Sequence, residues 1–138
     1  MAKSKLTRGE RQKIVQFLYR FELFDQAPDC GQIFESGSLD AQALKALDQV
    51  CARYLELKNL VEKSLAKQWT WKRTAPLERA ILVFGAYELS VNDAALVINE
   101  LVELTKDLIP GQTYQYINSV LDKISAEDVK NKDRRPKT

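Results

Sequence analysis

The least polar long segment of the chain runs over residues 76–89. Its apolar side chains cover nearly every face of a helical projection, which is typical of a helix surrounded by other helices. The proline that opens it suits a first helical turn, where its missing N–H needs no partner. The polar residues Glu78, Arg79 and Glu88 are expected where water or a partner can reach them. The pattern therefore predicts a central core helix, and Gly85 within it predicts the close approach of another helix.

Elsewhere, apolar residues recur every three or four positions, which is the spacing of amphipathic helices. A capping box of Thr7 and Glu10 predicts the start of a first helix. Caps at residues 92–93 and at residue 113 predict two later helices, and Ser125 opens a second capping-box sequence that predicts a final short turn. No segment alternates apolar and polar residues as strands do. The predicted fold is therefore all-α, a compact bundle of six or seven helices.

A long helix is predicted over residues 39–68, packed within the bundle. Its apolar positions recur at intervals of three and four, and Lys58 is the one polar interruption. The seam consists of Leu44, Leu47, Cys51, Tyr54, Lys58, Val61 and Leu65. Trp69 and Trp71 follow at its end. We interpret them as packing residues at a helix junction, and an aromatic platform for a nucleobase is the alternative.

The composition of the chain limits the kinds of protein that it can be. With 138 residues, of which 45% are hydrophobic, we expect one helical domain over 1–129 and a basic flexible tail over 130–138. No apolar run approaches the roughly 20 residues that span a bilayer, and no apolar signal core follows the N-terminus. The two cysteines, Cys30 and Cys51, lack a paired-motif spacing and fit free thiols in a reducing compartment. We therefore expect a cytoplasmic protein.

The chain contains no histidine. This excludes Ser-His-Asp and Cys-His catalysis and every zinc site that uses histidine. Neither a P-loop nor a glycine-rich dinucleotide fingerprint occurs. We therefore predict that the protein is not an enzyme and that it holds no metal and no cofactor.

Positive charge is concentrated at the N-terminus. Residues 1–20 carry six basic side chains and one acidic side chain, whereas residues 21–126 carry a net charge of −5. The basic cluster lies at the first turns of a predicted helix, where side-chain charges and unpaired N–H groups both suit a phosphate. An ordinary solvated helix end explains the same pattern equally well. A basic end on an acidic body also predicts a separate surface for a basic partner.

Three motifs in the second half of the chain follow one another in order. They read E-R-A-I-L-V-F-G-A-Y-E-L over 78–89, I-N-E-L-V-E-L-T-K over 98–106 and Y-I-N-S-V-L-D-K-I over 116–124. Two further features precede them: an arginine-containing opening that runs into V-Q-F-L-Y over 15–19, and the spacing of Trp69 and Arg73. Together these residues resemble the NusB transcription antitermination family, in order and over most of the chain.

The resemblance implies a small all-helical protein built from two helical subdomains. Members of the family bind the boxA element of nascent ribosomal RNA together with a small-subunit ribosomal protein, NusE. The complex modifies RNA polymerase against termination and supports ribosomal RNA synthesis. Some members form homodimers, which can cover the RNA-binding surface. We therefore expect a transcription antitermination factor whose partners are boxA-type RNA, NusE and the antitermination complex of RNA polymerase.

The family motifs place candidate site residues by position. Arg8 and Arg11 match the arginine-rich RNA-binding segment of the family, and Tyr116 matches an aromatic residue near its bound RNA. The RNA-binding set that the resemblance implies is Lys3, Lys5, Arg8, Arg11, Lys13, Gln112, Gln115 and Tyr116. The pair that it implies on the side facing NusE is Tyr19 and Glu78.

The chain departs from the family pattern within the RNA-binding segment. Where the family has a run of adjacent arginines, this chain has only Arg8 and Arg11, with Gly9 and Glu10 between them. Ser119 replaces the usual glycine of the third motif. A second hypothesis therefore stays open. In it, the protein is a helical protein-binding adaptor that keeps the NusE-type partner but has weak or no specific RNA binding.

Overall fold

Six α-helices and a short 3-10 helix form the regular structure of the described residues. The computed structural model describes residues 6–29, 31, 39–66 and 69–134, with side chains up to residue 127. The elements are α1 (Arg8–Glu22), α2 (Ala41–Ala52), α3 (Tyr54–Ser64), η2 (Trp71–Arg73), α4 (Pro76–Val91), α5 (Ala94–Leu108) and α6 (Thr113–Arg134). None of these described helices is long and apolar enough to cross a bilayer. The prediction of an all-α fold with six or seven helices is confirmed.

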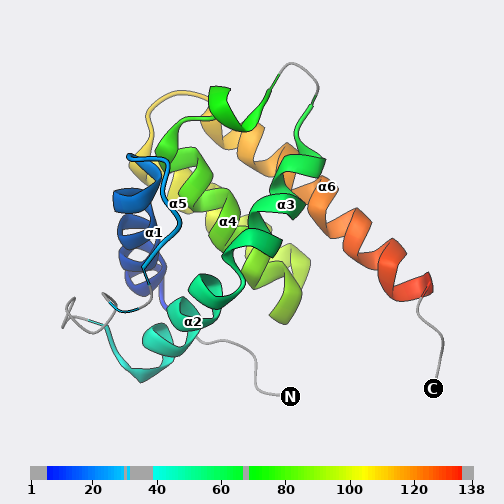
Figure 1. Cartoon of the computed structure of the whole chain (residues 1–138). Helices are drawn as coiled ribbons and strands as arrows, with labels where there is room; N and C mark the ends of the chain where they lie inside the picture. The colour runs from blue at the N-terminus through cyan, green and yellow to red at the C-terminus, as the bar shows by residue number, and fades with distance from the viewer. Residues whose placement is uncertain (1–5, 30, 32–38, 67–68, 135–138) are drawn as a thin grey trace.

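Helix α4 lies at the centre of the bundle and contacts each of the other five α-helices (Figure 1). All its residues from Arg79 to Leu89 are buried. Helices α1 to α3 and helices α5 and α6 pack around it, and their buried side chains form one hydrophobic cluster. The prediction of a central core helix is therefore confirmed.

Gly85 lies where α5 and α6 approach α4 most closely. A Cβ atom placed on it would lie 2.6 Å from Cδ2 of Leu121 and 2.9 Å from Cδ1 of Leu101. Both leucines are fully buried, so neither side chain has open space to move into. The close approach predicted at this glycine is confirmed, and it involves two neighbouring helices.

The prediction of one helix over 39–68 is wrong, because two helices occupy this range. Arg53 separates α2 from α3 with φ −106° and ψ 14°. Its guanidinium donates to Oγ of Ser90, 3.1 Å away at the end of α4, so the break is tied to a distant helix. The break also changes the phase of the buried face, since Leu57 lies in the core and Lys58 is only half-buried.

Helix α6 is longer than predicted. It continues without interruption to Arg134, so the turn expected at Ser125 does not form. The helix takes in the first residues of the predicted tail over 130–138, of which 135–138 lie outside the described residues. Neither proline nor glycine occurs between Ser125 and Arg134, so no helix-breaking residue ends the helix there.

The expectation that the polar residues of α4 face water is wrong for two of them. Arg79 is 5% exposed and Glu88 is 0% exposed, whereas Glu78 in the first turn is half-buried. Nη1 of Arg79 lies 2.6 Å from Oδ1 of Asp25, just after α1. Arg11 of α1 pairs with Glu88. Burial is tolerated because each charge has an opposite charge and hydrogen bonds in place of water.

Candidate nucleic-acid interface

The start of α1 is well defined by its cap. Oγ1 of Thr7 accepts the N–H of Glu10 at 3.1 Å, and the Glu10 carboxylate accepts the N–H of Thr7 at 2.9 Å. The predicted capping box is therefore present. It places Arg8 at the first helical position, where 51% of its side chain is exposed.

Two carboxylates of α5 face Arg8. Its guanidinium lies 3.8 Å from Glu100 and 3.8 Å from Asp107. Exposed ion pairs of this length contribute about 0–1 kcal/mol, since water screens them. Arg8 is therefore accessible to a phosphate group, which would compete with these two carboxylates for the guanidinium.

Arg11 is a core residue, which corrects the prediction that it contacts RNA. It is 4% exposed, and its Nε and Nη2 donate to the two carboxylate oxygens of Glu88 at 2.7 and 3.2 Å. Its Nη1 donates to the carbonyl of Leu6 at 2.8 Å. Asn92 donates to the same carboxylate at 3.1 Å. Because its donors are occupied inside the bundle, Arg11 instead joins α1 to α4.

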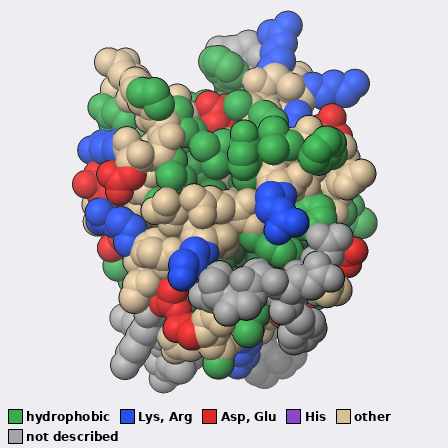
Figure 2. All heavy atoms as spheres, turned by 90° about the vertical axis from the view of Figure 1, so that its left-hand side faces the viewer, with side chains coloured by type: hydrophobic (Ala, Val, Ile, Leu, Met, Phe, Trp, Pro, Cys, Tyr) green, Lys and Arg blue, Asp and Glu red, His purple; other side chains and the backbone are tan. Residues whose placement is uncertain are grey.

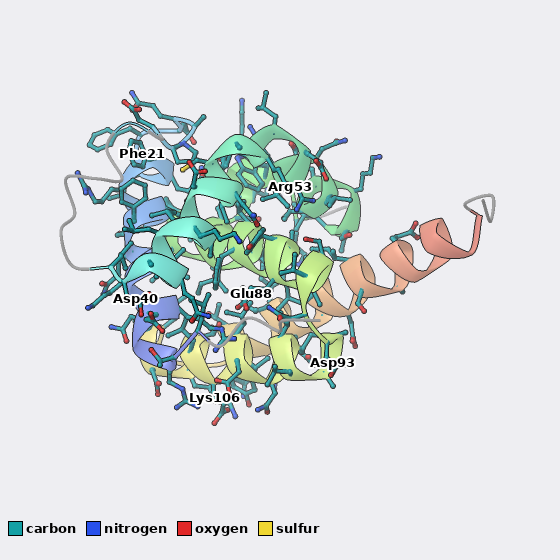
Figure 3. All side chains as sticks on the ribbon, turned by 90° about the horizontal axis from the view of Figure 1, so that it is seen from below. Phe21, Asp40, Arg53, Glu88, Asp93 and Lys106 are labelled. Carbon is teal, nitrogen blue, oxygen red and sulfur yellow. The ribbon has the colours of Figure 1, made fainter. Side chains whose placement is uncertain are left out.

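The view from below shows the same arrangement. Glu88 lies inside the bundle, whereas Asp93 and Lys106 lie at its rim (Figure 3).

A pattern in the sequence could have identified the pair of Arg11 and Glu88. Arg11 precedes Ile14, Val15 and Leu18 at the spacing of the buried face of α1, and Glu88 lies on an otherwise apolar helix.

Of the remaining basic residues of the predicted set, Lys13 lies within the described part of the chain. Lys13 is exposed on α1, and Lys3 and Lys5 lie outside the described residues. The side of the molecule that carries α1 shows Lys and Arg side chains lying apart, with hydrophobic side chains gathered between them (Figure 2). The described Lys and Arg side chains in this view are therefore spread out over the face.

Tyr116 lies in the first turns of α6 and is held by two neighbours. Its hydroxyl is 3.0 Å from Oγ1 of Thr74, and its ring centroid is 5.3 Å from that of Trp69. Burial raises the pKa of Tyr116 above its ordinary value of 10.0, so the phenol is neutral at physiological pH. Gln112 and Gln115 are exposed just before it, as surface contacts require.

The two tryptophans play different parts. Trp71 is half-buried, with Nζ of Lys58 at 5.1 Å and Cζ of Arg79 at 5.2 Å from its ring centroid. Its carbonyl also accepts a hydrogen bond from Nε of Arg79 at 2.9 Å. The packing interpretation is therefore confirmed for Trp71. Trp69, in contrast, is 45% exposed beside Tyr116, and the sequence alone did not separate the two roles.

The two residues predicted to meet a protein partner lie on neighbouring helices. The ion pair of Asp25 and Arg79 brings the end of α1 to the start of α4, and these segments carry Tyr19 and Glu78. Tyr19 is half-buried against the core. Oε1 of Glu78 accepts the N–H of Ala75 at 2.9 Å and so caps α4. This hydrogen bond engages one of the two carboxylate oxygens of Glu78.

Glu78 also acts on the predicted RNA-binding side. Its negative charge contributes to the raised pKa of Tyr116, after the larger effect of burial. The residue predicted to meet a protein partner therefore acts electrostatically on a residue of the predicted RNA-binding set.

An open groove of about 470 Å³ lies between α5 and α6. Gln115 lines it, together with the amides of Asn99 and Asn118, which the sequence did not single out as site residues. No group of three or more His, Cys, Asp or Glu residues in the described ranges is placed to hold a metal ion. The polar groups that the groove presents are amides, a carboxylate and a phenol.

The sequence matches those of known proteins over nearly the whole chain. The sequence model of the NusB family matches residues 8–126. The transcription antitermination protein NusB of Nitratiruptor sp. is 34% identical over 128 residues, which cover 88% of this chain and 91% of the relative. That of Sulfurimonas denitrificans is 34% identical over 125 residues, which cover 85% of this chain and 94% of the relative.

Solved structures show the same fold. The structure of T. maritima NusB superposes with a TM-score of 0.72 at 23% identity and covers 87% of this chain and 90% of that one. The solution structure of NusB from Aquifex aeolicus gives a TM-score of 0.70 at 23% identity and covers 95% of this chain and 93% of that one.

Proposed function

Because the chain belongs to the NusB family, we propose that it is a transcription antitermination factor that binds boxA-type RNA in nascent ribosomal transcripts. In this proposal it acts in the cytoplasm, together with the ribosomal protein NusE and RNA polymerase. One observation carries the proposal: the family match over residues 8–126 includes every described residue of the predicted RNA and partner surfaces. The family relatives named above are transcription antitermination proteins.

On the RNA side, the proposal assigns direct contacts to Arg8, Lys13, Gln112, Gln115 and Tyr116. Their exposure supports it for the first four, and the fixed ring of Tyr116 suits stacking on an unpaired base. Each neutralised phosphate contributes about −0.7 to the slope of log K against log salt on a single strand. The two cations should therefore account for a measurable part of that slope.

On the protein side, the proposal assigns NusE to the surface around Tyr19 and Glu78. A carboxylate oxygen that is not engaged in capping, on a body with net charge −5, is complementary to a basic ribosomal protein. A homodimer that covers the RNA surface would compete with RNA, so RNA should shift such a dimer towards monomer.

The test measures binding to boxA-type and scrambled single-stranded RNA at two salt concentrations, with and without NusE. The variant Arg8→Ala/Lys13→Ala should bind boxA-type RNA more weakly and with a flatter salt dependence. Lys63→Ala, an exposed lysine at the end of α3, serves as the matched control and should change neither. If the double variant keeps the affinity and the slope of the wild type, the proposed RNA surface is wrong.

The adaptor hypothesis also has an observation in its favour. Burial of Arg11 removes one more positive charge from an RNA-binding segment that was already sparse. This hypothesis expects tight binding to NusE and equal, weak binding to boxA-type and scrambled RNA. The same set of measurements therefore separates it from the antitermination factor that binds RNA specifically.

A further inference from the structure

Two aromatic rings meet at the surface where the segment before α4 crosses the start of α6. The ring centroids of Trp69 and Tyr116 lie 5.3 Å apart at an interplanar angle of 45°. This distance falls within the range of favourable aromatic pairs. Trp69 nevertheless leaves 45% of its area exposed to water, which is unusual for so large an apolar side chain. The pair therefore offers an aromatic surface that the protein does not cover itself.

Hydrogen bonds fix the hydroxyl of Tyr116 and the backbone of Trp69. The hydroxyl of Tyr116 is bonded to Thr74, and the hydroxyl of Thr74 donates to the carbonyl of Thr70 at 3.0 Å. The backbone N–H of Trp69 donates to the carbonyl of Ala66 at 2.8 Å. Since the phenol is engaged, Tyr116 presents only its ring to a ligand. Holding the Tyr116 ring in advance lowers the entropy cost of binding a flat ligand.

The segment after Trp69 is also anchored. Trp71 is half-buried, with Arg79 over its ring, and Thr70 caps η2 by accepting the N–H of Arg73 at 3.2 Å. This turn exposes two cationic side chains, Lys72 and Arg73, three and four residues after Trp69 in the sequence. Aromatic faces beside cations are the combination that binds single-stranded nucleic acid, because bases stack while phosphates pair with the charges.

We propose that Trp69 stacks on an unpaired base of the bound RNA, with Tyr116 as the second ring of the platform and Lys72 close to a neighbouring phosphate. This inference rests on the proposed RNA-binding function and extends it to a second segment, away from α1. A single strand fits this surface better than the NusE partner does. The exposed Lys72 attracts a phosphate backbone and repels a basic protein.

The experiment compares Trp69→Ala and Trp69→Phe with the wild type in binding to boxA-type single-stranded RNA at two salt concentrations. Loss of one stacked base should weaken binding by roughly 5- to 100-fold. The salt slope should stay unchanged, because no charge is removed. Trp69→Phe keeps an aromatic face and should stay within a few-fold of the wild type. Phe24→Ala, which removes another exposed aromatic residue (72% exposed), is the matched control and should not change affinity.

A second measurement reports the contact directly. The variant Trp71→Phe leaves Trp69 as the only tryptophan of the chain, so its fluorescence reports on this site alone. Addition of RNA should quench it if a base stacks on the indole.

The outcomes distinguish this inference from the function on which it rests. If the wild type binds boxA-type RNA and Trp69→Ala binds it equally well, the stacking role is wrong and the RNA-binding function stands. If Trp69→Ala loses affinity for NusE but not for RNA, the platform binds protein. If the wild type fails to bind RNA with or without NusE, both proposals are wrong. Circular dichroism establishes that each variant is folded, and Trp69→Phe keeps the test valid should the alanine variant unfold.

Discussion

The substitution Arg11→Ala tests whether this arginine belongs to the core. It leaves the carboxylate of Glu88 inside the bundle with Asn92 as its remaining side-chain donor among those described above. The side chains of Arg11 and Glu88 are 5% and 0% exposed, so the pair is shielded from bulk water and Arg11 supplies the charge that balances Glu88. Removing one partner of a buried ion pair costs about 3–5 kcal/mol. This is a large part of a typical stability of about 5–15 kcal/mol.

The assay is urea unfolding at pH 7, followed by far-UV circular dichroism. Arg8→Ala is the matched control, because it removes the same residue type from the same helix. Its two ion pairs are 3.8 Å long and exposed, so its loss should lower stability by about 0–1 kcal/mol. The double variant Arg11→Met/Glu88→Leu removes both charges and keeps most of the volume. It should recover much of the stability that Arg11→Ala loses.

Equal unfolding midpoints for Arg11→Ala and Arg8→Ala would refute the buried pair. RNA binding supplies an independent check on the two roles. Arg8→Ala should make the salt slope less negative by about 0.7, because one phosphate contact is lost. The folded double variant Arg11→Met/Glu88→Leu should keep the slope of the wild type. A changed salt slope in that variant would indicate that Arg11 contacts RNA after all.

Three further predictions concern other parts of the molecule. Gly85→Ala should lower the unfolding free energy by up to about 2 kcal/mol in urea, because overpacking costs about 1–3 kcal/mol and helix propensity returns about 1 kcal/mol. Burial raises the pKa of Glu22 above its ordinary value of 4.5. The contribution of this carboxyl to stability is therefore complete below pH 4.5, and it is lost as the pH rises through the raised pKa of the folded protein. The variant Glu22→Gln can still accept the hydrogen bond from Tyr54, and its stability relative to the wild type should therefore increase with pH across that window. Asp107→Asn removes a competitor for Arg8 and should strengthen RNA binding by up to about fivefold at low salt.

Each of these predictions has a clear contrary result. A Gly85→Ala variant as stable as the wild type would show that the neighbouring leucines move aside freely. A stability difference between Glu22→Gln and the wild type that does not vary with pH would show that the carboxyl is not perturbed by burial. Unchanged RNA affinity in Asp107→Asn, measured with Lys63→Ala as a surface control, would show that the ion pairs of Arg8 do not compete with phosphate.

Local patterns predicted much of the fold. The apolar run over 76–89 predicted the central helix, the capping box of Thr7 and Glu10 predicted the start of α1, and Gly85 predicted a close helix approach. These features depend on side-chain spacing and on hydrogen bonds within one turn, which nearby residues determine. The break at Arg53 was missed because no proline or glycine marks it. A contact with Ser90, 37 positions away, accompanies it.

The candidate site was predicted less completely, for a related reason. Motif positions identified Arg8 and Tyr116, which the structure describes as exposed and half-buried. A motif position does not say which way a side chain points, and so Arg11 was assigned to the surface with Arg8. The exposure of Trp69 and the burial of Trp71 likewise depend on how the chain crosses α4 and α6.

The sequence by itself determined the helical class, the central helix and the membership of the NusB family, because periodicity and ordered motifs are properties of the chain alone. Only the tertiary structure decided which charges are buried and which are available to a ligand. Arg11 and Glu88 are 77 positions apart, and their pairing depends on the packing of α1 against α4. Burial free energy depends on everything that surrounds a group, so it belongs to the packed molecule and not to a local sequence pattern.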